Sequence, residues 1–276
     1  MNVTFTTRRA GLAVAVCLAL VSHVSAATIS ASSSGYGLRT DISALGIDLD
    51  VGPLPNGVSD SAPAPYNLAN SVANVNVTSN IPLVVSGEVG ASLVNGAASS
   101  NVDGLPGNRL TTASGGIVGA DIGAVTLPII GNGLTILGLN GTLSSTAQIS
   151  GDFGSLVATG TTTIESLSLT LAGTVVSLAP YVGVNVAPNT IVDLSGLGIL
   201  NATLILNEQN VAPDNSSIAV NALRLTTNLL NIGGEIILGH SQCSVATVPE
   251  PVGGLLALTA LMLGMAFRSR RAHARS

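Results

Sequence analysis

The stretch Ser166-Leu167-Ser168-Leu169-Thr170-Leu171 alternates hydroxyl-bearing and leucine side chains without interruption. Successive side chains of a β-strand point to opposite faces of the sheet, so this pattern predicts a strand with an apolar inner face and a polar outer face. Residues 200–207 and 74–78 alternate in a similar way. No long segment of residues 27–248 keeps an apolar period of 3.6 residues, and we therefore expect an all-β chain.

Turn-forming residues separate these apolar stretches, and they cluster at residues 53–65, 101–108, 187–189 and 212–217. Asn140-Gly141 predicts a two-residue hairpin turn, because both residue types tolerate the positive φ that such a turn requires. We expect an antiparallel β-sandwich with an aliphatic core. A β-solenoid is the alternative, and it is less favoured because no repeat of fixed length runs through the sequence.

The composition excludes several classes of protein. Of the 276 residues, 46% are hydrophobic, 8% are charged and 2% are aromatic, and lysine is absent. Between residues 27 and 248, three arginines stand against thirteen acidic residues, a net charge of −10. A surface this acidic cannot neutralise phosphates, so nucleic acid is excluded as an expected partner.

Residues 1–26 are typical of a secretory signal peptide. Two arginines precede a short apolar run, and small residues follow that run. A positive start, an apolar centre and a small-residue end are the parts that signal peptidase recognises. We expect cleavage between Ala26 and Ala27, followed by export of the β-rich domain 27–248.

The C-terminal segment, residues 249–276, combines a proline-containing tripeptide, an apolar run and a basic tail. The tripeptide Pro249-Glu250-Pro251 is stiff and extended, and it precedes the apolar run 252–267. As a helix this run measures about 24 Å, and flanking arginines that snorkel to the interface allow it to span a membrane. The basic tail 268–276 holds its end in the cytoplasm, which places the domain on the opposite side. The arginines of the tail are Arg268, Arg270, Arg271 and Arg275.

Together, the tripeptide, the apolar helix and the arginine cluster resemble the PEP-CTERM sorting signal of Gram-negative bacteria. The resemblance implies that Pro249-Glu250-Pro251 is recognised by an exosortase, a processing enzyme embedded in the membrane. It also implies that the chain is anchored briefly in the inner membrane with its body in the periplasm. The mature protein would then reach the cell surface or the extracellular matrix, where such proteins are often associated with polysaccharide.

The body of the chain resembles the choice-of-anchor P family of exported bacterial proteins. The resemblance lies in Ser34-Gly35-Tyr36-Gly37, in Val51-Gly52-Pro53-Leu54-Pro55 and in three later stretches, residues 204–209, 220–225 and 234–240. It implies closing strands near the C-terminal end of the domain, and it implies no activity.

Residues suited to nucleophilic chemistry are few. Cys17 lies in the predicted signal peptide, which leaves Cys243 as the single thiol of the domain. His240 stands three residues before it and invites a nucleophile–base interpretation. Residues i and i+3 of a strand point to opposite faces, however, so we expect a structural thiol and no cysteine catalysis or zinc site.

Acidic residues suggest two further alternatives. Asp48 and Asp50 flank Leu49 and share one strand face, which could help to hold calcium, with Asp41 and Asp60 as additional ligands. A solvated strand face is the simpler explanation. A glycoside hydrolase would need two convergent carboxylates. The acids available for that role are scattered singly along the chain: Glu88, Glu165, Glu208 and Glu235.

From these features we expect an exported structural or adhesion protein of the cell surface or matrix, without catalysis and without a cofactor. A glycan-binding or calcium-binding module is the alternative, and a hydrolase with dispersed carboxylates is a third. The expected partners are signal peptidase, the exosortase, the membrane and extracellular polysaccharide.

Overall fold

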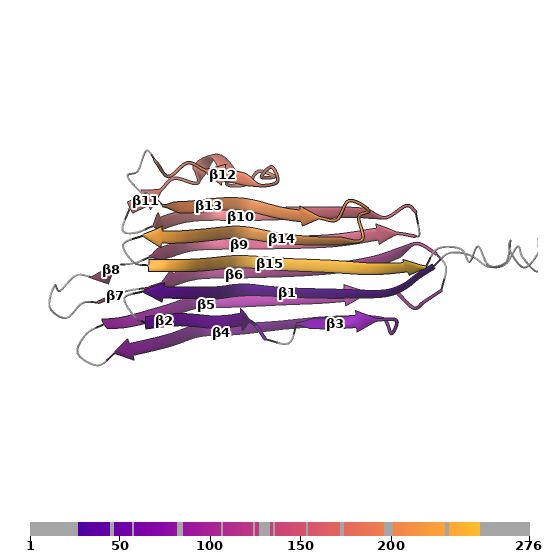
Figure 1. Cartoon of the computed structure of the whole chain (residues 1–276), viewed down its shortest axis with the longest axis horizontal. Helices are drawn as coiled ribbons and strands as arrows, with labels where there is room; N and C mark the ends of the chain where they lie inside the picture. Colours follow the sequence, from indigo (N-terminus) through magenta and orange to yellow (C-terminus); the bar gives the residue numbers. More distant parts are fainter. Residues whose placement is uncertain are drawn as a thin grey trace, which may run out of the picture.

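In the computed structural model the chain forms two antiparallel sheets that pack face to face and do not close on each other (Figure 1). The structure describes residues 27–248, except 45–46, 57, 82–84, 106, 124, 127–132, 135, 153, 172–173, 196–200 and 230–231. The prediction of an all-β chain is confirmed. The alternative of a β-solenoid does not fit, because solenoid coils stack parallel strands and the ladders here are antiparallel.

Each sheet follows a simple strand order. Sheet A contains, in order, β12 (Thr190–Val192), β13 (Ala202–Val211), β14 (Ser217–Leu229), β15 (Ile232–Val248), β1 (Ala27–Ala44) and β2 (Ile47–Leu54), and β3 (Ser59–Ala62) also pairs with β1. Sheet B contains, in order, β11 (Thr174–Val176), β10 (Val157–Leu171), β9 (Leu137–Gly151), β6 (Arg109–Ile122), β5 (Val85–Ser100), β7 (Val125–Thr126) and β8 (Gly133–Leu134), and β4 (Tyr66–Ile81) pairs with β5. A 3₁₀ turn, Ala179–Tyr181, follows β11.

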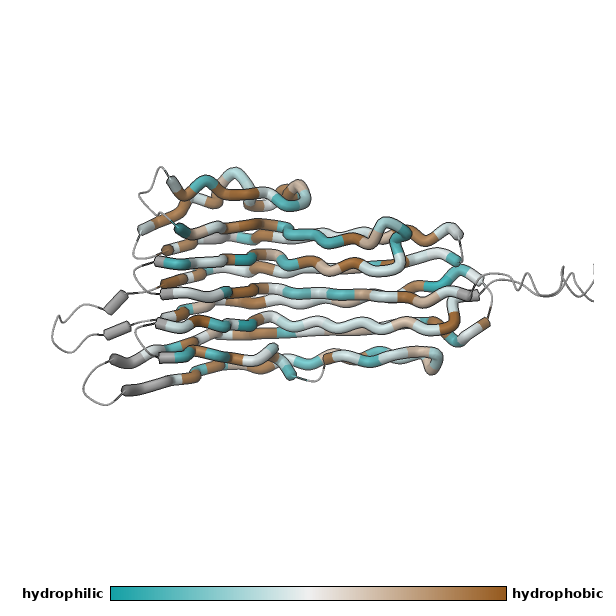
Figure 2. Tube along the Cα trace, viewed as in Figure 1, coloured by the Kyte–Doolittle hydropathy of each residue, from teal (hydrophilic) through white to brown (hydrophobic). Residues whose placement is uncertain are grey.

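The core has two halves of different composition. Figure 2 shows the apolar residues gathered toward one end of the strands and paler residues toward the other. In the aliphatic half, leucine, isoleucine and valine from both sheets form the largest buried cluster, which includes Leu38, Leu137 and Leu238. The other half, the narrow half, combines Ala113, Ala147 and Cys243 with Ile149, Ile218 and Val220. Branched aliphatics therefore dominate the core of the aliphatic half, and small side chains make up a larger share of the core in the narrow half.

In the narrow half the backbones of the two sheets come into contact. A Cβ atom added to Gly115 of β6 would lie 2.1 Å from the Tyr36 carbonyl oxygen and 2.2 Å from the His240 carbonyl oxygen, both in sheet A. A Cβ atom on Gly35 would lie 2.0 Å from the Ser114 carbonyl oxygen. Face-to-face sheets usually lie about 10 Å apart with side chains between them. Only glycine fits where that separation is lost.

Polar groups also join the sheets in this half. The Ser145 hydroxyl of β9 donates to the Ser241 hydroxyl of β15 over 2.9 Å, and both side chains are buried. The Cys243 thiol donates to the Ala147 carbonyl oxygen over 3.3 Å. Buried polar groups that are paired in this way avoid the cost of desolvation and fix the position of one sheet on the other.

A line of backbone irregularities, the kink line, separates the two halves in both sheets. Several of its residues have positive φ angles: Asn74, Gly119, Gly141, Asn207 and Gly239. Register places them side by side with Ser92, Asn140, Ala222 and Gly37 across neighbouring strands.

Strands such as β14 exchange their inner and outer faces at the kink line, whereas β9 keeps odd positions in the core on both sides of it, with Leu139 and Leu143 both buried. In β14, Val220 and Ala222 are buried before the line, and Leu223 and Leu225 are buried after it. An extra or distorted residue shifts the two-residue alternation by one position, so odd positions replace even ones in the core.

The Asn140-Gly141 hairpin prediction is wrong. Both residues lie inside the continuous strand β9. Gly141 has a φ of 139°, and the register shifts on both sides of it. Positive-φ tolerance is used here for a bulge, and sequence alone does not distinguish a bulge from a turn.

The backbone contact between the sheets makes Gly115 a sensitive position. We expect Gly115→Ala to lower the free energy of unfolding by about 2–4 kcal/mol, because the new methyl group meets two carbonyl oxygens that cannot move independently. Gly233→Ala on β15 is the matched control, since a Cβ atom there has no neighbour within 4 Å, and its effect should stay within about 0.5 kcal/mol. Denaturant unfolding followed by circular dichroism measures both changes. Equal midpoints for the two variants would contradict the narrow packing.

Candidate functional site

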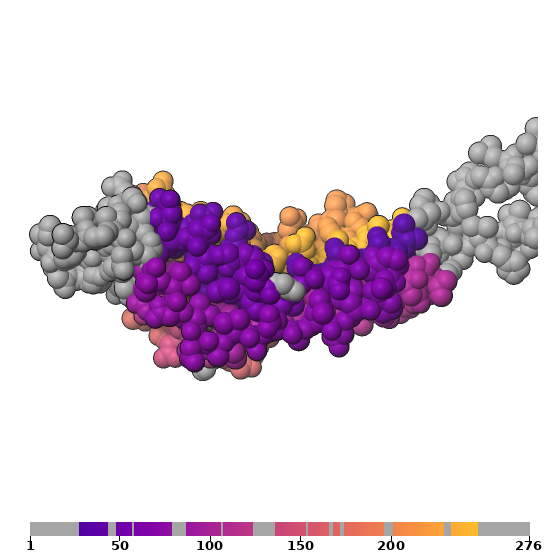
Figure 3. Space-filling model, turned by 90° about the horizontal axis from the view of Figure 1, so that it is seen from below, coloured from indigo at the N-terminus to yellow at the C-terminus, as the bar shows by residue number. Residues whose placement is uncertain are grey.

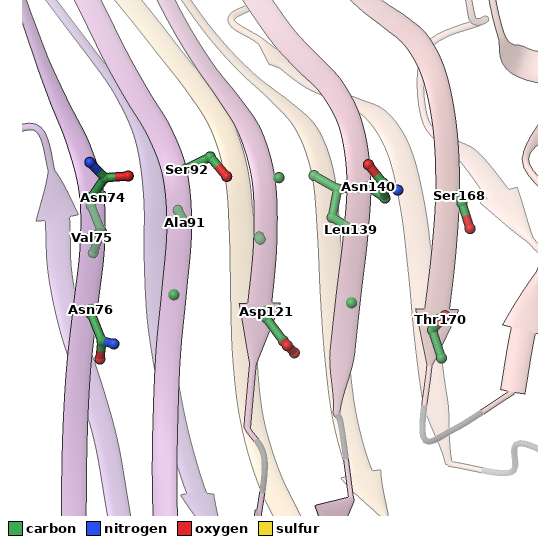
Figure 4. Close-up of a pocket in the computed structure, with 14 residues that line it drawn as sticks. Asn74, Val75, Asn76, Ala91, Ser92, Asp121, Leu139, Asn140, Ser168 and Thr170 are labelled. Atoms are coloured by element: carbon green, nitrogen blue, oxygen red, sulfur yellow. The ribbon is translucent and has the colours of Figure 1, made fainter.

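A groove crosses the outer face of sheet B beside the kink line (Figure 4). It has a volume of about 680 Å³ and is formed by β4, β5, β6, β9 and β10. Its polar lining residues are Asn74, Asn76, Ser92, Asp121, Asn140, Ser168 and Thr170. Five strands at a spacing of about 4.8 Å make the groove about 20 Å long, perpendicular to the strand direction.

The shape of the groove follows from the sequence of the strands that form it. One row of paired, outward-facing positions runs Asn76, Gly90, Asp121, Gly138 and Thr170. Glycine at every second position of this row leaves the backbone uncovered between polar side chains. The strands bend at the neighbouring kink line, so the outer surface is depressed where side chains are missing.

The groove is suited to neutral, hydroxyl-rich ligands. Amide and hydroxyl groups dominate its lining, and Asp121 is the one charged residue among the described residues that line it. Asn76 donates to Glu88 Oε1 over 3.1 Å. Among the described residues, no hydrogen bond engages the side chains of Asn74, Ser92 or Asn140. Free amides that both donate and accept are the groups that recognise sugar hydroxyls.

A second polar cluster, the Arg224 network, lies on the outer face of sheet A. Arg224 Nη1 donates to Glu208 Oε1 over 2.7 Å, and its Nε donates to Glu235 Oε1. Asn221 Nδ2 donates to Glu208 Oε2 over 2.6 Å. Asn221 Oδ1 then lies 2.6 Å from His240 Nδ1. These hydrogen bonds connect β13, β14 and β15 into one chain of polar groups.

The donors and acceptors of the network determine the tautomer of His240. An ionised glutamate accepts hydrogen bonds and donates none. Asn221 must therefore direct its Nδ2 toward Glu208 and its Oδ1 toward the imidazole. His240 Nδ1 therefore carries a proton. Its ring stacks on Tyr36, with centroids 4.5 Å apart and planes inclined by 20°. Burial, with a smaller contribution from the nearby positive charge of Arg39, lowers the pKa of His240 from 6.5 to about 4.

The four dispersed glutamates do not form the paired acids of a hydrolase. Glu208 and Glu235 are brought together, yet both accept hydrogen bonds from Arg224. The hydrogen bond from Arg224 to Glu208 also raises the pKa of the guanidinium, which therefore stays charged. Glu88 is bonded to Asn76, and Glu165 is exposed on β10. A general acid needs a raised pKa in an apolar setting, which an arginine partner opposes.

The calcium candidates are placed as their alternation predicts, on a solvated strand face. Asp48 and Asp50 of β2 are exposed, with Leu49 buried between them. Asp50 lies opposite Asp41 of β1. Asp60 pairs with Ser33 and lies far along the sheet. Among the described residues, no group of three or more histidine, cysteine, aspartate or glutamate side chains could hold a metal ion.

His240 and Cys243 point to opposite faces of β15. The thiol is completely buried between the sheets, and burial raises its pKa to about 12. The imidazole belongs to the Arg224 network on the outer face. The arrangement agrees with the prediction of a structural thiol, since a protonated, enclosed sulfur cannot act as a nucleophile.

The predicted processing residues mostly lie outside the described part of the chain. Ala27 begins β1, whereas Ala26, Pro249, Glu250, Pro251 and the tail arginines are not described. The predicted signal peptide 1–26 and the predicted membrane span 252–267 also lie outside the described residues. No helix in the described residues is long and apolar enough to cross a membrane.

Comparison with protein-family models, with curated proteins and with solved structures finds no match to this chain. The geometry alone therefore defines the class: an all-β domain with a polar groove on one outer face and the Arg224 network on the other. Sequence reasoning predicted neither feature. The groove requires knowledge of strand register, and the only sequence signal for it is glycine alternating with polar residues at positions that pair across strands.

The depressed pKa of His240 predicts a specific loss of stability in acid. Above pH 6.5 the imidazole is neutral in both the folded and the unfolded chain. No charge is then buried on folding, so His240 does not make stability depend on pH there. Between pH 6.5 and about 4 only the unfolded chain takes up the proton, so stability falls as the pH falls, by up to about 3 kcal/mol.

Urea unfolding at pH 7.5 and pH 4.5 measures this effect. We expect His240→Gln to lose about 2–3 kcal/mol less than the unaltered chain between the two values. Acidic groups titrate in both proteins and cancel in the comparison. Identical pH dependence would show that the imidazole is not held neutral by burial.

Proposed function

We propose that the chain is an exported β-sandwich protein of the cell surface or extracellular matrix, with a structural or adhesive role and no catalysis. Signal peptidase removes residues 1–26. The PEP-CTERM segment 249–276 then holds the domain at the periplasmic side of the inner membrane of a Gram-negative bacterium, and an exosortase processes it at Pro249-Glu250-Pro251.

The pairing of the domain's two ends is the observation that best supports this proposal. Ala27 lies opposite Val248 at the end of the β1–β15 ladder. The residues that follow the proposed signal cleavage and those that precede the proposed sorting motif therefore meet at one tip (Figure 1). A 17-residue strand such as β15 is about 55 Å long. A domain held at this tip would stand on end, with its long sides free for contacts.

Replacement of the central glutamate tests the proposed sorting. We expect Glu250→Ala to abolish C-terminal processing, because the acidic side chain between two prolines is the recognisable group of the exposed elbow. Mass spectrometry of the C-terminal peptide in the producing bacterium measures the result. Glu165→Ala, which removes an exposed carboxylate within the domain, is the control and should be processed normally. Normal maturation of the Glu250→Ala chain would refute the sorting proposal.

Glycan binding in the groove of sheet B is the second candidate function. The groove runs across five strands, so an extended ligand meets rows of polar side chains with at least one on each strand, about every 4.8 Å. A polysaccharide repeats along its length and can use such rows in register. The free amide of Asn140 lies on β9, the fourth of the five strands that form the groove (Figure 4).

We expect Asn140→Ala to weaken binding to the bacterium's own polysaccharide by about 5- to 20-fold, the equivalent of one or two lost hydrogen bonds. Thr163→Ala on the same sheet, outside the groove, should bind as the unaltered chain does. Co-sedimentation with the insoluble polysaccharide measures both. Equal binding by the two variants would exclude the groove as the binding site.

A further inference from the structure

β4 is a long strand edge that the described part of the chain leaves open. It pairs with β5 on one side only. Its sixteen residues, Tyr66–Ile81, include no charged residue and no proline. Figure 3 shows this side of the molecule, where the N-terminal strands face solvent along its length. An edge of this kind presents unpaired backbone N–H and C=O groups that another strand can use.

The opposite edge of sheet B is protected by side chains and a loop. Beyond the short strand β11, the outward carbonyl oxygens of β10 accept hydrogen bonds from other elements. Asn215 Nδ2 donates to Leu156 O, Gln209 Nε2 donates to Gly160 O, and Gly183 N donates to Ile164 O, over 3.0, 2.9 and 3.0 Å. These contacts satisfy the groups that a further strand would need.

The edges of sheet A are also protected. Asn189 continues the pairing beyond β12, because it donates from its backbone to Asn207 O and accepts from Gln209 N at its Oδ1. At the other edge β2 and β3 are short and separate, and prolines and aspartates lie along them. These residues are Asp48, Asp50, Pro53, Pro55, Asp60, Pro63 and Pro65. Charge and proline are the usual protection of a sheet edge.

The remaining edge is best suited to a second copy of the same chain. The domain carries a net charge of −10, so two copies repel over most of their surfaces. An uncharged edge is the place where they can approach at the lowest electrostatic cost. Val72 and Val77 are 36% and 39% exposed on β4, and each would lose contact with water in a paired edge.

We propose that two copies pair through antiparallel β4 strands around a twofold axis near Asn74. That residue lies at the middle of Tyr66–Ile81 and has a φ of 56°. With a twofold axis at Asn74, the distorted backbone of one β4 strand lies beside the same distorted backbone of the partner strand. The regular parts of the two strands then pair on both sides of the distortion. Such an interface uses the same patch on both copies, as closed dimers do.

The same axis joins the two grooves. Asn74 and Asn76 form the β4 end of each groove, and antiparallel addition within one sheet keeps the same face of both copies on one side. The two kink lines then become one continuous line, and the grooves form a single trough of about 40 Å across ten strands. The pairing itself requires neither export nor processing of the chain.

Sedimentation of the full chain, kept in one detergent throughout, tests the pairing. We expect the unaltered chain to sediment as a dimer at tens of micromolar, and the chain with both Val72→Lys and Val77→Lys to sediment as a monomer. The matched control carries Val157→Lys and Val175→Lys on the protected side of sheet B, where the valines are 53% and 66% exposed, and it should remain a dimer. A monomeric unaltered chain, or a dimer that survives the first pair of substitutions, would overturn the proposal.

Cross-linking locates the axis independently. With the axis at Asn74, two copies of residue 73 lie diagonally across the paired strands, about 7–8 Å apart. We expect a short bis-maleimide to join chains that carry Ala73→Cys and not chains that carry Thr163→Cys, which is exposed on β10. Equal cross-linking of both variants, or none of either, would refute the β4 interface.

Discussion

The contact between the two backbones in the narrow half is the constraint on which the rest of the structure depends. Gly35 and Gly115 lie against carbonyl groups of the facing sheet, at distances that exclude a Cβ atom. At these points no side chain fits between the sheets, and beside them Ala113 and Ala147 pack together with Ile149, Ile218 and Val220. Glycine at these positions is thus a consequence of the close approach of the two sheets.

Because the core is narrow in one half and wide in the other, the two sheets must diverge where the halves meet. The kink line provides this divergence, because residues with positive φ bend the strands and, in strands such as β14, move the core-facing residues from even to odd positions. The bend that widens the core also depresses the outer surface of sheet B, where Gly90 and Gly138 leave the backbone uncovered. The groove and the two-part core therefore have the same physical origin.

The shift at the kink line in which positions face the core explains how much of the structure the sequence predicts. Local alternation identified strands correctly: Leu169 and Leu171 are buried on β10, and Leu204 and Leu206 on β13. Alternation could not predict the kink line, because a bulge is specified by register with neighbouring strands. Asn140-Gly141 was misassigned to a turn for the same reason. Similarly, Arg224, Glu208 and His240 are distant in sequence, and only strand pairing reveals that they form one network.

The position of the chain ends determines which surface remains available to partners. Ala27 and Val248 meet at the tip of the narrow half, so an attachment at either end would leave both long sides of the domain unobstructed. One of those sides is closed by side-chain amides and a loop, and the other exposes β4. A contact made sideways through β4 does not compete with an attachment at the tip, because the two lie at right angles to each other. An anchored domain could thus associate laterally in the plane of a surface, with its groove extended and still open to the outside.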